Sequence, residues 1–145
     1  MRKHQIALIA VFGLLCTAAP ALAHHSFAVE YDGDKLVAVK GILTRVDWQN
    51  PHVWFFVDVK DENGNVTNWG FETSSPTRMH HEYPNIRRDF LASIGKVVSV
   101  VACPAKRVPT MGSSESIKLA EGSVLKIGVA YTGSENEDQV LQNVK

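Results

Sequence analysis

The sequence is poor in cysteine, in net charge and in long apolar runs, and each shortage excludes a class of protein. Two cysteines are present, Cys16 and Cys103, too few for a small disulfide-stapled scaffold. Fifteen basic residues balance 15 acidic residues, which argues against a nucleic acid or an anionic membrane held by charge. The longest apolar run, 6–15, is too short to span a bilayer as a helix.

Sequence motifs of catalysis are missing as well. The chain contains no Gly-x-Ser-x-Gly elbow, no phosphate loop, no HExxH pair and no Cys-x-x-Cys. Asp58 and Glu72 stand in strand-like segments, where surface positions are the simpler interpretation. Cys103 ends the apolar segment 97–103, which favours a small buried side chain over a nucleophile. We predict that the protein is not an enzyme.

The first 23 residues have the features of a signal peptide. A basic start at Arg2 and Lys3 precedes the apolar run, and Pro20 precedes the small-residue site Ala21-Leu22-Ala23. A transmembrane anchor would need about 20 apolar residues, and lipidation at Cys16 is disfavoured because Leu15 precedes it. We expect a periplasmic or secreted protein without a stable membrane anchor.

Cleavage after Ala23 changes the composition and the N-terminus. Removing 23 of the 145 residues leaves 122, the size of one small domain, with 13 basic and 15 acidic residues. Cys16 is lost, so Cys103 has no partner for an intramolecular disulfide. The domain is expected over 24–131, and a polar, mobile tail over 132–145.

The mature chain has the periodicity of strands. Segments 35–48, 52–60 and 66–73 are rich in β-branched or alternating residues and are joined by turns, including Asn63-Gly64. A helix is expected over 85–94, where Gly95 suits a C-cap, and strands over 96–102, 116–120 and 124–127. This order predicts an all-β fold with one short helix, an OB-fold-like Greek-key barrel of five or six strands. An open β-sandwich would usually need about seven strands.

Several motifs carry a family resemblance. The most specific are His24-His25-Ser26-Phe27 and Asn50-Pro51-His52-Val53-Trp54, and ordinary strand and turn residues follow at Asn68-Trp69, Glu72, Pro76, Arg88-Asp89, Gly95 and Pro104-Ala105-Lys106. In these the chain resembles a group of small exported bacterial proteins, domain of unknown function family 6152, from about residue 24 to about 125. The resemblance implies an exported OB-like domain and no assigned activity. At 78–84 the chain departs from the family pattern, so His80 and His81 inherit nothing from it.

The histidines suggest a metal site. After cleavage, the amino nitrogen and Nδ1 of His24 can close a chelate ring on one metal, and the amino group releases its proton easily near neutral pH. His52, which follows the first inter-strand loop, would add a second imidazole, and His25 a third position. Nitrogen donors in this arrangement suit copper(II) best. The alternatives are a mobile terminus at His24, a turn-capping role for His52, and a solvated loop at His80 and His81.

A second hypothesis needs no metal. Val53, Phe55 and Val57 alternate with Trp54 and Phe56, so only one set can fill a barrel. If the outer face is open, Trp54 and Phe56 could stack on a small ligand, a glycan or a partner protein. If it is covered, both rings are packing residues.

Overall fold

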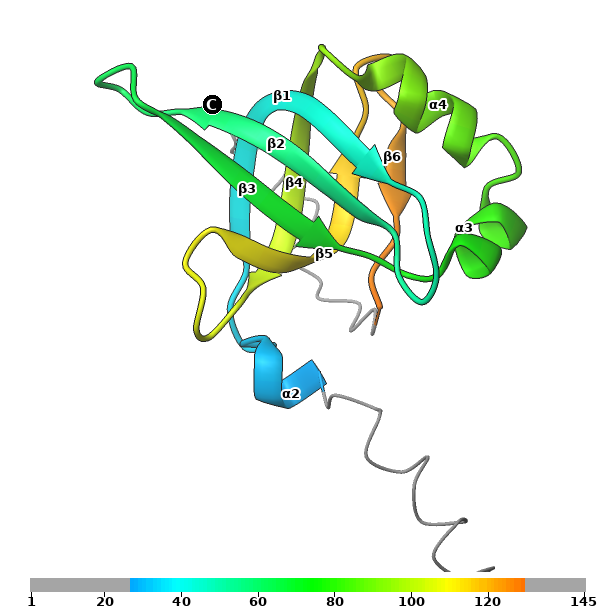
Figure 1. Ribbon diagram of the computed structural model, residues 1–145, viewed down its shortest axis with the longest axis horizontal. Helices are drawn as coiled ribbons and strands as arrows, with labels where there is room; N and C mark the ends of the chain where they lie inside the picture. Colours follow the sequence, from blue (N-terminus) through cyan, green and yellow to red (C-terminus); the bar gives the residue numbers. More distant parts are fainter. Residues whose placement is uncertain (1–26, 130–145) are drawn as a thin grey trace, which may run out of the picture.

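The structure, a computed structural model, describes residues 27–129, and its main feature is one curled sheet (Figure 1). Six strands and three short helices make up this part of the chain. In chain order they are α2 (Phe27–Glu30), β1 (Val37–Asp47), β2 (Trp54–Lys60), β3 (Val66–Glu72), α3 (Pro76–Glu82), α4 (Ile86–Ser93), β4 (Val97–Pro104), β5 (Met111–Lys118) and β6 (Val124–Lys126). None of these helices has the length and apolar character needed to cross a membrane.

The first five strands close into a barrel. β1, β2 and β3 form an antiparallel meander, β4 returns to pair with β1, and β5 pairs with β4. A short parallel pairing of Gly70–Glu72 with Met111–Ser113 joins the start of β5 to β3, and β6 pairs with the end of β5. The predicted OB-like barrel is therefore confirmed.

The middle of β1 is shaped by a glycine. A Cβ atom on Gly41 would lie 2.2 Å from the backbone oxygen of Asp58, so only glycine allows β1 and β2 to approach this closely. The β1–β2 register then shifts between Leu43 and Arg45. Such an irregularity increases local twist, which helps a sheet to curl into a barrel.

The alternation in β2 decides which residues fill the barrel. Val53, Phe55 and Val57 are fully buried, whereas Trp54 and Phe56 on the opposite face are half-buried. The core includes Phe71 and Phe90, whose rings lie 5.3 and 5.6 Å from that of Phe55. Of the two sets that the alternation separates, Val53, Phe55 and Val57 thus fill the interior of the barrel.

Two helices lie between β3 and β4, where one was expected. α4 (Ile86–Ser93) matches the prediction over 85–94 and buries Ile86 and Phe90. α3 corresponds to a stretch that we expected to be turns. It forms because the Ser75 side chain accepts a hydrogen bond from the Arg78 N–H and Pro76 occupies the first turn. α2 was also not predicted, since a single turn leaves no periodic signal.

The fifth strand begins earlier than predicted. We expected 116–120, but β5 is Met111–Lys118 and pairs with β4 through Pro104↔Gly112. Its small polar residues, such as Ser113 and Ser114, are buried. β5 is held by hydrogen bonds to the strands on either side of it, so its residues do not need strong β-propensity of their own. The sequence pattern therefore did not indicate where β5 begins.

Candidate functional site

His52 and Glu72 meet at the end of the β2–β3 hairpin. The N–H of Val53 donates to the Ser74 carbonyl, and the N–H of Thr73 donates to the Val53 carbonyl. These bonds bring the segment before β2 alongside the end of β3, where Nδ1 of His52 contacts Oε1 of Glu72. The Glu72 side chain is 13% exposed, so the expectation that it is a surface residue is wrong.

Tyr31 holds the other oxygen of the same carboxylate. Its hydroxyl donates to Oε2 of Glu72 at 2.5 Å. Burial raises the pKa of the Tyr31 phenol well above its usual range, and the hydrogen bond to Glu72 and the negative charge of that carboxylate act in the same direction. Tyr31 therefore stays a hydrogen-bond donor at all ordinary pH values.

Tyr31 is placed by contacts with the loop between β4 and β5. It forms an isolated antiparallel bridge with Ala105, and the following N–H of Asp32 donates to the Pro104 carbonyl. Lys106 reaches back to α2, where its Nζ donates to the Ala28 carbonyl at 2.6 Å. The start of the described chain is thereby fastened to the barrel at the site.

The shared carboxylate determines what the imidazole can do. A carboxylate only accepts hydrogen bonds, so Nδ1 is the nitrogen of His52 that donates a proton. In the neutral ring the lone pair then lies on Nε2. His52, whose side chain is 33% exposed, can present that lone pair to a metal ion or a ligand proton.

The predicted metal ligands are only partly within the described structure. His24 and His25 lie outside residues 27–129, and His52 is the only one of the three whose surroundings are described. Within this range, no group of three or more His, Cys, Asp or Glu side chains is placed to hold a metal ion.

The two predicted aromatic residues have different surroundings. Phe56 is covered by the guanidinium of Arg45, whose Cζ lies 3.9 Å from the ring centroid. Trp54 pairs with Glu72 across the hairpin and lines an open groove beside Tyr31. Of the two rings, Trp54 is thus the one available to a ligand.

The remaining candidates lie away from this cluster. His80 and His81 are exposed residues of α3, which corrects the expectation of a loop there. Cys103 is fully buried, as predicted, and burial together with the nearby Glu115 carboxylate raises the pKa of its thiol to about 12. A thiol held neutral in this way is a packing residue and not a nucleophile.

Neither Tyr31 nor the role of Glu72 was recognised from the sequence pattern. A usable signal for Glu72 was present, because the hairpin register around Asn63-Gly64 pairs residue 54 with 72 and so brings Glu72 close to His52. No such signal exists for Tyr31, which is 41 residues from Glu72 in the chain.

Comparisons with known proteins bear on the family alone. No curated protein matches this sequence. The model of a family described as "Family of unknown function (DUF6152)" matches residues 10–114, which is most of the chain, and the protein belongs to that family.

Proposed function

We propose that the protein is a small exported binding protein that holds a transition-metal ion, preferably copper(II). The donors are the amino group and imidazole of His24 in the processed chain and Nε2 of His52, with His25 as a further candidate. The signal-peptide features of residues 1–23 supply the export and the new N-terminus.

The contact between His52 and Glu72 carries this proposal. Histidines that bind metal through one ring nitrogen usually donate the other N–H to a carboxylate or a carbonyl, which fixes the tautomer and the ring orientation. Here Glu72 accepts from Nδ1 of His52 while Tyr31 immobilises its second oxygen. His52 thus has the support that a metal-binding imidazole needs.

The chain between His24 and the His52 cluster is short enough for the donors of His24 to lie near His52. His24 precedes Phe27 by three residues, so their Cα atoms can be at most about 11 Å apart. Phe27 contacts Tyr31, with ring centroids 5.4 Å apart, and Tyr31 contacts Glu72. A processed N-terminus would therefore stand only three positions along the chain from Phe27, which packs against Tyr31 of the cluster.

The test is a copper(II) titration of the protein purified from the periplasm, after mass spectrometry has established its N-terminus. A matched chain with one extra residue before His24 keeps every side chain but removes the terminal chelate. We expect the processed form to bind at least about tenfold more tightly, and His52→Ala to weaken it. Nitrogen hyperfine structure in the electron paramagnetic resonance spectrum should report the donors.

Substitution of Glu72 by glutamine distinguishes a supporting carboxylate from a bystander. Loss of such a partner typically weakens metal affinity by about 10–100-fold. Asp58→Asn is the matched control, because Asp58 lies on the same hairpin and its carboxylate accepts a hydrogen bond from the exposed Asn68 side chain. Equal binding by the processed and extended chains would refute the terminal-amine site.

A second candidate function is metal-free ligand binding on the aromatic face. The groove beside Trp54 favours it, because OB folds generally bind their ligands on strands two and three and on the loops after strands one and four. That likeness concerns the position of a site and not its ligand. Ligand binding by the chain with the blocked His24 amine, in the presence of a chelator, would support this function independently of copper.

A further inference from the structure

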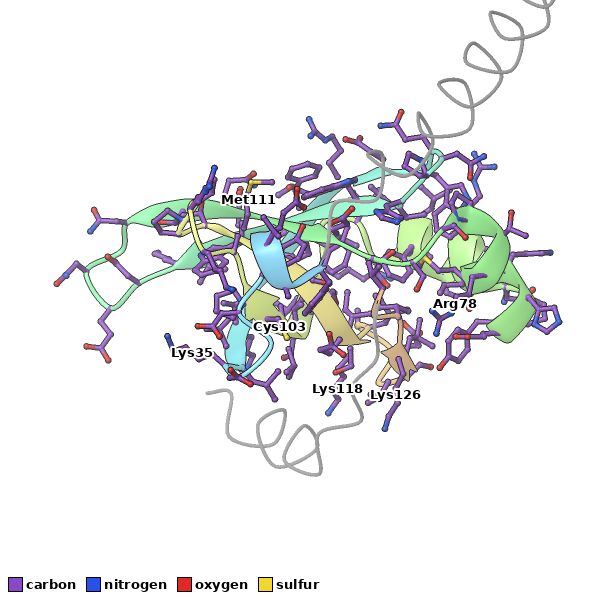
Figure 2. All side chains as sticks on the ribbon, turned by 90° about the horizontal axis from the view of Figure 1, so that it is seen from below. Lys35, Arg78, Cys103, Met111, Lys118 and Lys126 are labelled. Carbon is purple, nitrogen blue, oxygen red and sulfur yellow. The ribbon has the colours of Figure 1, made fainter. Side chains whose placement is uncertain are left out.

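The groove beside Trp54 has the size of a small-molecule site. Its volume is roughly 580 Å³, within the range of about 300–1,000 Å³ that is usual for such pockets. Three parts of the chain line it: α2 with Tyr31, the adjoining ends of β2 and β3, and the segment from Ala105 to Met111. Figure 2 shows Met111 next to α2, on the side of the barrel away from Lys118 and Lys126.

The walls of the groove are mostly apolar. Val29 on α2 is 60% exposed and Val108 in the β4–β5 loop is 43% exposed, although both are large hydrophobic residues. Trp54 and Met111 are half-buried between them. An aromatic ring and a thioether are adaptable contacts for an apolar body.

Arg107 is the basic side chain of the groove, which the carboxylates of Glu30 and Glu72 also line. Both oxygens of Glu72 are occupied, one by His52 and one by Tyr31, and Glu30 has an interaction of its own. Arg107 is exposed and, among residues 27–129, makes no hydrogen bond or ion pair. A guanidinium in this state binds a carboxylate well, because its planar fork can donate two parallel hydrogen bonds.

We propose that this groove binds a small organic carboxylate with an aromatic or aliphatic body. The body lies against Trp54, Met111 and Val108, and the carboxylate pairs with Arg107. The proposal rests on the second candidate function, metal-free ligand binding, and is independent of the copper site.

The probe for the test is 3-phenylpropionate, compared with its uncharged amide, 3-phenylpropionamide. Both are titrated by NMR into the chain that carries one extra residue before His24, with EDTA present. Because this chain lacks the terminal chelate, failure here leaves the copper proposal intact, and failure of copper binding leaves this proposal intact. A ligand of this size is expected to bind in about the millimolar range.

We expect 3-phenylpropionate to bind at least about fivefold more tightly than 3-phenylpropionamide. The chemical-shift changes of the backbone N–H groups should be concentrated at residues 29–31 and 105–111. Arg107→Gln should abolish this preference, and Trp54→Ala should weaken both probes. Arg87→Gln, an exposed arginine of α4 outside the groove, should change nothing. Equal binding of acid and amide, no effect of Arg107→Gln, or tighter binding of phenethylamine would overturn the proposal.

Discussion

Removal of the Tyr31 hydroxyl tests the cluster from which both proposals start. Tyr31 is 6% exposed, and its hydroxyl donates to a carboxylate that is itself 13% exposed. Hydrogen bonds to charged groups contribute about 1.5–3 kcal/mol. Tyr31→Phe should therefore lower the free energy of unfolding by about 2 kcal/mol, which is a shift of about 1 M in the urea midpoint for a domain of this size.

Tyr83→Phe is the matched control. The Tyr83 hydroxyl accepts a 3.1 Å hydrogen bond from the Lys126 N–H at an exposed position, so its loss should cost about 1 kcal/mol or less. In a Glu72→Gln background, Tyr31→Phe should cost less than in the parent, because the charged acceptor is already gone. Equal destabilisation by Tyr31→Phe and Tyr83→Phe would refute the reasoning.

The same residue gives a pH signature. Folding raises the pKa of Tyr31 above its ordinary value of 10.0, so below pH 10 the phenol is protonated in both states and its contribution is complete. Above pH 10 the unfolded chain loses this proton while the folded chain keeps it. The Tyr31 phenol should then lower the free energy of unfolding by about 1.4 kcal/mol for each pH unit. Tyr31→Phe should not show this decrease when unfolding by urea is measured at each pH.

Three further predictions concern the barrel and the helix α3 that follows β3. Gly41→Ala should destabilise by about 2 kcal/mol or more in thermal unfolding, because its Cβ would lie 2.2 Å from the Asp58 carbonyl oxygen; an unchanged midpoint would contradict this close approach. Cys103, with its thiol pKa raised from 9.0 to about 12, should resist thiol reagents at pH 8 until the protein unfolds. The contribution of the Cys103 thiol to the free energy of unfolding should decline between pH 9 and 12, and this decline should be absent in Cys103→Ala. Rapid labelling of the native protein by a thiol reagent would argue against burial. Ser75→Ala should cost about 1 kcal/mol in urea unfolding by removing the N-cap of α3, and no change would mean that the cap is not needed.

The sequence predicted those features of the barrel that depend on neighbouring residues. Alternation in β2 separated Phe55 from Trp54, and the Asn63-Gly64 step located the hairpin, because side-chain direction and turn geometry depend on neighbouring residues. The need for glycine at position 41 has a cause that is not local, because the backbone of Asp58, which leaves no room for a Cβ atom, lies on another strand. Features with weak local signals, such as the polar start of β5, were not recognised.

The candidate site was recognised only in part. His52 was identified from its residue type and its place after the first inter-strand loop, and Trp54 from its place with Phe56 on one face of the strand. Their partners were not, since Tyr31 precedes the barrel and reaches Glu72 across 41 residues. Arg107 gave no signal either, because an unpaired cation is distinguished from a solvated one only by the groove around it.

The sequence by itself determined the succession of strands along the chain, the division of β2 into two faces and the family, because each depends on short-range patterns or motifs. The tertiary structure alone decided that Glu72 joins His52 to Tyr31, and that Trp54, Met111 and Arg107 line one groove. Closing the barrel brings the ends of β2 and β3 next to the β4–β5 loop. Contacts between segments so far apart in the chain follow from barrel closure, which no local pattern encodes.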